Sequence, residues 1–169
     1  MKFSSNIQVI QAQFDGPKLK PIYAHGVEDA GCDLKANIPN PITIAPWKSA
    51  WVGTGVHLAM PEGMFALQAP RSGLSCNHGI TLANAPGIID PGYRGEIRCK
   101  LVNLSDEPYT VYPLERIAQL VFLPFVNAVF TDVDSLPESS RGEDGYGSTG
   151  ALEMRSLISY RILISLLPR

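Results

Sequence analysis

The sequence predicts an all-β fold of the sandwich, jelly-roll or barrel kind. Fifteen glycines and 14 prolines occur among the 169 residues, and they recur every few residues as far as Pro124. This spacing leaves little room for a long amphipathic helix, because proline interrupts a helix and glycine weakens one. Short apolar and β-branched runs lie between these breaks, which is typical of strands joined by close turns.

Two segments show most clearly the patterns that strands adopt. Residues 96–102 alternate polar and apolar side chains, as expected of a strand with one solvent-exposed face. Residues 117–123 are almost continuously apolar, which indicates a strand covered on both faces. The predicted strands are residues 6–12, 32–36, 42–44, 50–52, 56–60, 64–69, 95–103, 109–112, 116–125 and 129–133.

One main domain with two C-terminal segments is predicted. Residues 1–135 form the β domain, and residues 136–150, rich in serine, glutamate and glycine, form a flexible arm. Residues 151–169 are an extension of unknown role, whose apolar part is shorter than the ~20 residues that a membrane span requires. Disorder or incidental packing is the preferred interpretation of this extension, with a subunit-docking segment, a membrane-surface helix or a frameshifted end without a role as alternatives.

Charge and cysteine content restrict the partners and the compartment. The net charge is −2, so no basic excess indicates binding to nucleic acid. Cys32, Cys76 and Cys99 lie far apart, without the spacing of a zinc site or a disulfide framework. The N-terminus has no apolar signal segment. We therefore expect a reducing cytoplasm, with no membrane and no nucleic-acid partner.

Two segments carry residues that suit phosphate or a metal. Asp33 follows a glycine at the start of a predicted strand, although an aspartate there is more often a solvated turn residue. Residues 69–75 combine Arg71, Ser72 and Gly73, which supply paired cationic donors, a hydroxyl and an accessible N–H. A plain turn would have the same composition, so neither segment is decisive alone.

A tight hairpin is predicted for residues 84–95. Proline and glycine on both sides hold Asp90 in the turn, with Tyr93 close by and the amide of Asn84 at the start. Such a hairpin is suited to reading the edge of a base and to seating a carboxylate against a water. A hairpin whose polar side chains simply face solvent is the alternative.

Two segments nearer the C-terminus also carry candidate site residues. Gln119 lies in the most apolar predicted strand and needs a partner if buried, because an unpaired amide there costs roughly 1–3 kcal/mol. Residues 141–150 place four glycines around Arg141 and Tyr146, a composition suited to a loop that closes over a nucleotide. An unstructured linker is the alternative for this loop.

In this order and with these gaps, the five segments resemble the five motifs of the trimeric dUTPase family. The resemblance covers roughly residues 22–150. It implies a jelly-roll or distorted β-barrel subunit, in a homotrimer whose active sites are shared between subunits. It also implies a Mg²⁺-dependent dUTP diphosphatase that hydrolyses dUTP to dUMP and pyrophosphate by water attack on the α-phosphorus. This reaction keeps uracil out of DNA and supplies dUMP for thymidylate synthesis.

The resemblance implies a role for each matching residue. Asp90 is the catalytic residue that orients the attacking water, and Asp33 holds Mg²⁺ through water. Tyr93 packs on the deoxyribose, where a ribose hydroxyl would clash. The hairpin reads uracil, the arm closes over base and phosphates, and substrate binding is implied for Arg71, Ser72, Gly73, Asn84, Gly87, Ile89, Tyr93, Gln119, Arg141, Tyr146, Gly147, Ser148 and Thr149.

The chain departs from the family pattern at three positions. Gly92 stands where family members often have aspartate, and Asn77 lies near a position that is usually basic. Asp144 replaces a glycine common in the arm, and it brings a negative charge close to the triphosphate. Asp144 is the departure that bears on closure of the arm.

Two other functions compete with dUTP hydrolysis. A dCTP deaminase has a similar hairpin, but it needs a catalytic glutamate where this chain has Lys100, and it lacks the Pro-Arg-Ser-Gly-Leu of residues 70–74. A nucleotide-binding regulatory protein on the same fold is the second alternative. All the polar groups of the enzyme are present, which favours hydrolysis.

Overall fold

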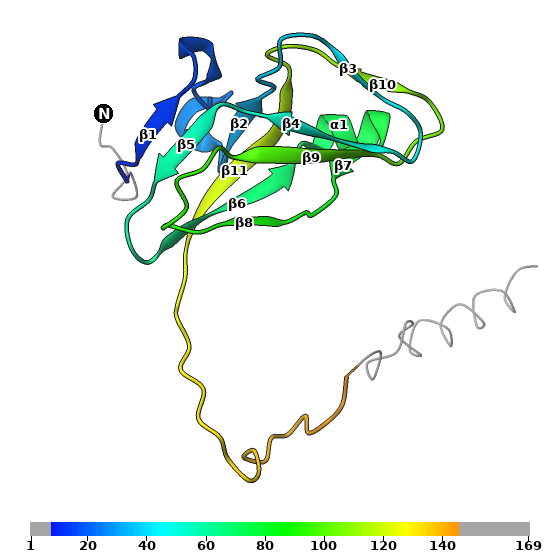
Figure 1. Ribbon diagram of the computed structural model, residues 1–169. Coiled ribbons are helices and arrows are strands. Elements are labelled where there is room, and N and C mark those ends of the chain that lie inside the picture. The colour runs from blue at the N-terminus through cyan, green and yellow to red at the C-terminus, as the bar shows by residue number, and fades with distance from the viewer. Residues whose placement is uncertain (1–7, 146–169) are drawn as a thin grey trace, which may run out of the picture. The chain divides into compact units, whose positions relative to one another are not determined.

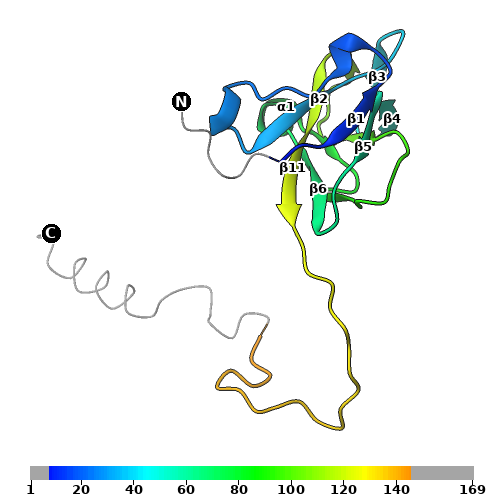
Figure 2. The ribbon, with the colours of Figure 1, turned by 90° about the vertical axis from the view of Figure 1, so that its left-hand side faces the viewer.

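A computed structural model describes residues 8–145 and confirms the all-β fold. Its strands are arranged in two facing layers (Figure 1, Figure 2). Two short 3-10 turns and one α-helix accompany the strands in the described chain. The elements are β1 (Gln11–Phe14), β2 (Gly31–Lys35), β3 (Ile42–Ile44), β4 (Ser49–Gly53), β5 (Val56–Ala59), β6 (Met64–Pro70), α1 (Ser72–His78), β7 (Ile80–Leu82), β8 (Gly87–Ile89), β9 (Arg98–Asn103), β10 (Tyr109–Val111) and β11 (Arg116–Pro124).

The strands pair antiparallel throughout the described chain. One sheet has the order β2-β11-β6-β8, a second has the order β4-β9-β7, and β1-β5 and β10-β3 form two further pairs. The neighbours in each sheet are distant in sequence, as expected of a jelly-roll fold. In particular, β11 lies between β2 and β6, which brings three of the five motifs side by side.

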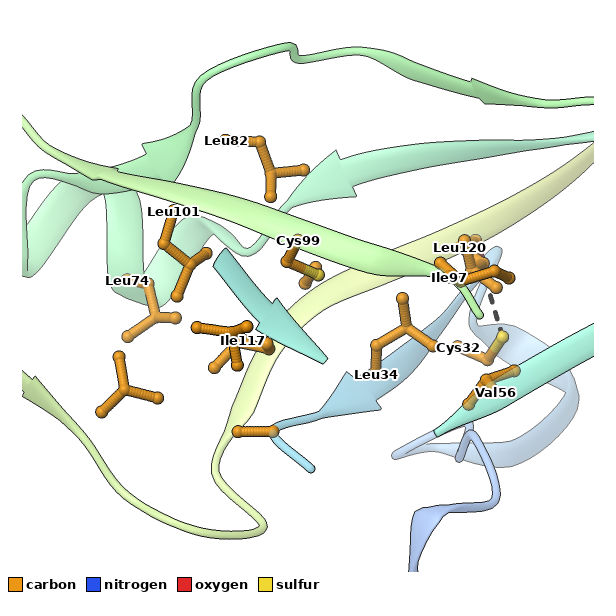
Figure 3. Packing of buried hydrophobic residues seen from close by; sticks show 14 of the residues in the cluster. Cys32, Leu34, Val56, Leu74, Leu82, Ile97, Cys99, Leu101, Ile117 and Leu120 are labelled. Carbon is orange, nitrogen blue, oxygen red and sulfur yellow. Dashed lines mark hydrogen bonds between the residues drawn. The ribbon is translucent and has the colours of Figure 1, made fainter. Parts of the chain in front are cut away.

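The apolar core lies between the two larger sheets. Leu34 and Ile117 come from one sheet and Cys99 and Leu101 from the other, and Figure 3 shows these side chains gathered in one cluster. Each of the four is at most 1% exposed. Burying an aliphatic side chain of this size contributes about 1.5–3 kcal/mol, so this cluster holds the two layers together.

The register of the four-stranded sheet places the motifs. Asp33 of β2 lies directly opposite Gln119 of β11, and Gln119 lies opposite Ala69 of β6. Residues directly opposite each other point to the same face of a sheet, so the first and fourth motifs are neighbours. On the other side of β6, Gln68 pairs with Gly87 of β8, which puts the third motif at the opposite edge.

Helix α1 was not predicted from the sequence. Its serine, glycine and asparagine are weak helix formers, and local propensity gave no signal. Burial of Leu74 against the core favours the helix, which ends at His78 and is capped by Gly79. The N–H of Gly79 donates to the carbonyls of Leu74 and Ser75, with φ at 67°, in the left-handed region that glycine adopts most readily.

Several strand predictions were wrong in their bounds. The first strand covers Gln11–Phe14 rather than residues 6–12, of which residues 6 and 7 lie outside the described residues. β9 begins at Arg98, and the three-residue strands β7 and β8 were not predicted because runs so short carry little pattern. Residues 129–133 form no strand, since a β-branched run forms one only where another strand offers ladder hydrogen bonds.

The chain divides into two units, residues 1–127 and 128–169. Within the second unit, residues 128–145 carry neither helix nor strand, and a turn around Gly142 is held by its N–H donating to the carbonyl of Ser139 at 3.1 Å. The boundaries predicted at residues 135 and 150 stay predictions. None of the helices in the described chain has the length and apolar character of a membrane span.

Candidate active site

Asp33 lies at the centre of the first group of predicted site residues. It is 7% exposed, and Oδ1 accepts a hydrogen bond from Nε of Arg71 at 2.7 Å. Oδ2 accepts from Nη1 of Arg116 at 3.1 Å, and Nη1 of Arg71 donates to the Arg116 carbonyl at 3.2 Å. Two guanidinium groups surround one carboxylate, so this cluster carries a net positive charge suited to phosphate.

Gln119 has the partner that its place in an apolar strand required. Its Nε2 donates to the main-chain carbonyl of Pro70 at 2.9 Å. The amide lies over Gly31, where an added Cβ would stand 3.2 Å from Cδ of Gln119 and closer still to Oε1. The glycine of the first motif therefore makes room for the glutamine of the fourth.

Asp33, Arg71, Gln119 and Gly31 line a cavity of about 240 Å³, which we call the Asp33 cavity. It is also lined by Ser72, from the first turn of α1, and by Ala24, His25 and Asp29 from the loop before β2. The N–H of His25 donates to Oδ2 of Asp29 at 2.6 Å, and Nδ1 of His25 lies 3.0 Å from Oδ1. These hydrogen bonds, the main-chain one first, lower the pKa of Asp29.

Sequence reasoning gave no role to His25 and Asp29, two residues that line the Asp33 cavity. Arg116 was expected beside Gln119 near the phosphate chain, and its pairing with Asp33 depends on strand register. His25 and Asp29 lie in a loop whose sequence has no periodic pattern. Gly73 belongs to the first turn of α1 but is not among the residues that line the cavity.

The predicted base-binding residues surround a second cavity of about 270 Å³, which we call the hairpin cavity. It lies beside β8 and the turn that follows. The predicted residues that line it are Asn84, Gly87, Ile89, Asp90 and Tyr93, and the others are Trp51, Gln68, Ile88, Glu96, Ile97 and Arg98. A cavity of this size and mixed lining suits part of a small molecule.

Asp90 stands at the end of β8 with an exposed side chain. Its main-chain carbonyl accepts the N–H of Tyr93 at 3.1 Å, which closes the turn. At the other end of the hairpin the Ala85–Pro86 peptide is cis. The turn leaves the Asp90 carboxylate accessible to a water, as orientation of a nucleophile requires.

Gln68 forms the floor of the hairpin cavity. It is 1% exposed, and Nε2 donates to the Arg98 carbonyl at 3.3 Å and to Sγ of Cys99 at 3.2 Å. A Cβ built on Gly87 would stand 3.0 Å from Oε1 of Gln68, so glycine allows β8 to approach this side chain closely. Burial raises the pKa of the Cys99 thiol to about 12.

The arm residues fall in the second unit or outside the described chain. Nε of Arg141 donates to the carbonyl of Asp144 at 2.8 Å, and the N–H of Asp144 donates to the Arg141 carbonyl at 3.1 Å. The Asp144 side chain is exposed. The remaining predicted arm residues, which are Tyr146, Gly147, Ser148 and Thr149, lie outside the described residues.

The two cavities share no lining residue. Asp33 belongs to β2 and the hairpin to β8, and these are the two edge strands of one sheet, separated by β11 and β6. Neighbouring strands are ~4.8 Å apart, so the two edges are about 14 Å apart. One copy of the chain thus presents the predicted phosphate-side and base-side groups in separate cavities.

Known proteins share both the motifs and the fold. The dUTPase family model matches residues 21–150. The chain belongs to the dUTPase family. Deoxyuridine 5'-triphosphate nucleotidohydrolases of Leifsonia xyli subsp. xyli and Chlamydia pneumoniae are each 48% identical to it, over 134 and 123 residues. These matches cover 79% and 72% of this chain, and 86% and 85% of the relatives.

A solved structure of a dUTPase supports the same assignment. The Staphylococcus bacteriophage 80alpha dUTPase with dUPNHPP is similar with a TM-score of 0.77 and 26% identity, over 86% of this chain and 100% of that one. Within the dUTPase fold, Lys100 of β9 lines neither the Asp33 cavity nor the hairpin cavity. Its Nζ lies 5.6 Å from the ring centroid of Trp51. Lys100 therefore contributes no side chain to the lining of either cavity.

Proposed function

We propose that this chain hydrolyses dUTP to dUMP and pyrophosphate, with water attacking the α-phosphorus. One observation carries the proposal: polar groups from separate segments of the sequence gather around one cavity, where the Asp33 carboxylate pairs with the arginines of two further segments. These groups are Asp33, Arg71, Ser72 and Gln119. Membership of the dUTPase family supports the same reaction.

The Asp33 cavity is proposed to bind the phosphate chain. Asp33 holds the guanidinium groups of Arg71 and Arg116 in place before a substrate arrives. Charge that develops on the phosphate oxygens then meets donors that need no reorganisation, which is the main source of electrostatic catalysis. Ser72 adds a hydroxyl and a first-turn N–H, a group that lacks an intrahelical partner.

Asp33 fits a magnesium ion held through water. Each carboxylate oxygen accepts one arginine hydrogen bond, and a carboxylate offers about four lone-pair sites in all, so acceptor sites remain for the ion's waters. Among residues 8–145 no three His, Cys, Asp or Glu side chains lie together as metal ligands. Mg²⁺ commonly takes only one or two carboxylates and completes its shell with waters and substrate phosphates. When bound, it neutralises charge on the phosphates.

The hairpin cavity is proposed to hold uracil and deoxyribose. Main-chain groups of the hairpin and the amide of Asn84 supply the donors and acceptors that a base edge requires. Tyr93 forms a wall against the sugar and excludes a 2'-hydroxyl. An aspartate is a weak base, so Asp90 acts mainly by holding the water in line with the α-phosphorus.

The arm completes the proposed site. Arg141, Ser148 and Thr149 meet the β and γ phosphates with Gly147, and Tyr146 stacks on uracil, which excludes bulk water from the reaction. Cys32, Cys76 and Cys99 are all free thiols, as suits the reducing cytoplasm proposed for the enzyme.

We infer that each active site is shared between copies in a homotrimer. One dUTP molecule must contact the hairpin cavity with its base and the Asp33 cluster with its phosphates, so the two cavities must lie next to each other. In a single copy they lie at opposite edges of one sheet. A rotation that sets the β8 edge of one copy against the β2 edge of the next joins them. Head-to-tail contacts of this kind close into rings.

The reaction is tested by measuring pyrophosphate release from dUTP, dCTP and UTP with Mg²⁺. We expect release from dUTP and much slower release from the other two. Ammonia release from dCTP would assign the chain to the deaminases instead. An absence of any product, with dUTP still bound, would assign it to the nucleotide-binding regulators.

Shared sites are tested by co-expressing Asp90→Asn and Asp33→Asn chains with different affinity tags. Each variant alone lacks one half of every site, but a mixed oligomer contains sites with an intact hairpin from one copy and an intact Asp33 from another. Random mixing restores about a quarter of the sites. Doubly tagged oligomers without activity above either parent would contradict sharing, and light scattering gives the number of chains.

A further inference from the structure

Tyr93 is held in place from two sides. Its hydroxyl donates to the main-chain carbonyl of Glu96 at 3.0 Å. Its ring lies against Gly95, and the side chain as a whole is 45% exposed, with its free side on the hairpin cavity. The tether and the contact with Gly95 together fix where the ring stands.

Gly95 is the glycine of this hairpin that has no room for a side chain. A Cβ built on it would stand 2.5 Å from Cζ of Tyr93 and 2.9 Å from Cε2, and nearer still to the hydroxyl. Real Cβ atoms do not approach so closely, so the ring would have to move. Gly92, three residues away in the same turn, has no atom within 4 Å of its built Cβ.

The backbone does not demand glycine at either position. The described glycines with positive φ are Gly26, Gly55, Gly63, Gly79 and Gly142. Gly95 and Gly92 therefore adopt backbone conformations open to other residues. The three atoms nearest to a Cβ at Gly95 all belong to Tyr93, so a methyl group there would collide first with the residue that lines the hairpin cavity.

We propose that Gly95 is a positioning residue that sets the sugar specificity of the enzyme by giving the Tyr93 ring its place. The inference rests on the proposed function, in which Tyr93 packs on deoxyribose. A methyl group at position 95 displaces the Tyr93 ring and lengthens the hydrogen bond from its hydroxyl to the Glu96 carbonyl. Displacements of about 1 Å in a positioned group are large enough to impair an active site.

The displaced ring affects the two sugars unequally. For dUTP, the fitted contact with the deoxyribose is lost. For UTP, the clash that excluded its 2'-hydroxyl is relieved at the same time. The quantity that reports on Gly95 is therefore the ratio of kcat/KM for dUTP to kcat/KM for UTP, which a general loss of stability would leave unchanged.

The experiment compares Gly95→Ala with the matched control Gly92→Ala in the full chain. We expect Gly95→Ala to lower the dUTP to UTP ratio about tenfold, mostly through kcat/KM for dUTP. Gly92→Ala keeps the wild-type ratio and rate, because its methyl group meets open space. An unchanged ratio in a folded Gly95→Ala enzyme overturns the proposal, as does an equal change in the control.

A double-mutant cycle shows whether Gly95 acts through the ring. In a Tyr93→Ala background, Gly95→Ala should change the ratio no further, since nothing remains to be displaced. If Gly95→Ala alone does not fold, we expect the Tyr93→Ala/Gly95→Ala chain to fold, because the ring that collides with the methyl group is absent. A double variant that also fails to fold overturns the proposal. Wild-type enzyme that does not favour dUTP over UTP contradicts the proposed function itself. This outcome is distinct from the outcomes that overturn only the role of Gly95.

Discussion

The Asp33 cavity is organised by charge, whereas the hairpin cavity is organised by main-chain turns and small residues. In the first, one carboxylate holds two arginines, so the functional groups hold each other. In the second, Asp90 is exposed, and the glycines at 87 and 95 let neighbouring side chains approach closely. In the first region the residues proposed to bind phosphate and metal also hold each other in place, and in the second region the proposed catalytic residue and the residues that shape the cavity are different ones.

The largest expected effect separates activity from structure at the hairpin. Asp90→Asn should lower kcat about 1000-fold, because the amide cannot hold the attacking water as the carboxylate does. Dissociation constants for a non-hydrolysable dUTP analogue and the melting temperature should change little, since the side chain is exposed. Isothermal titration and thermal unfolding check both points, and retained turnover would remove Asp90 from the catalytic role.

The next largest effect is expected at Asp33, where one substitution should lower both activity and stability. Asp33→Asn should lower kcat/KM about 100-fold, as loss of a residue that orients metal and phosphate ligands commonly does. It should also lower the free energy of unfolding by about 2 kcal/mol, because Arg71 and Arg116 then face each other without an anion, partly screened by solvent. Urea unfolding measures this. Full stability in Asp33→Asn would show that the ion pairs are not structural.

A smaller effect is expected from Gly31→Ala. The added methyl group displaces the Gln119 amide and breaks its hydrogen bond to the Pro70 carbonyl, which is worth roughly 1 kcal/mol or about fivefold in kcat/KM. Gly16→Ala is the control, because its built Cβ meets Leu19 at an ordinary 3.7 Å. Equal kinetics in the two variants would mean that Gln119 does not depend on Gly31.

The smallest expected effect is on stability at high pH, and it concerns Cys99, the buried thiol that contacts Gln68 of the hairpin cavity. Burial raises the pKa of Cys99 from its ordinary 9.0 to about 12. Above pH 9 the unfolded chain releases a proton that the folded chain keeps, so stability falls as the pH rises from about 9 towards 12. Cys99→Ala should flatten this fall, by on the order of 1 kcal/mol at pH 10, in urea unfolding. An equal fall in the free energy of unfolding with pH in the wild type and Cys99→Ala would contradict this role of Cys99.

The sequence alone gave the order and identity of the motifs. Arg71, Ser72, Asn84 and Asp90 could be proposed as site residues because phosphate and base recognition need particular residue types at particular spacings, and these are local. The strands with a clear pattern, such as β6 and β11, were predicted within a residue of their bounds. Local chemistry and periodicity are properties of the chain that require no partner segment.

The helix and the close packing could not be predicted in this way. Residues 72–78 are helical although their propensities are poor, because Leu74 is buried against the core. Residues 129–133 have strand propensity and form no strand. Secondary structure depends at such positions on long-range contacts, which no window of sequence contains.

The sequence by itself determined what this protein acts on, and the tertiary structure decided how the groups are arranged. Residue types fixed the family, but only strand register sets Asp33 between two arginines and gives Gln119 its partner. Only the order of strands in the sheet puts the hairpin and the Asp33 cluster at opposite edges. The reason is that pairing between distant segments is settled by burial of a common core, and that burial is a property of the whole folded chain.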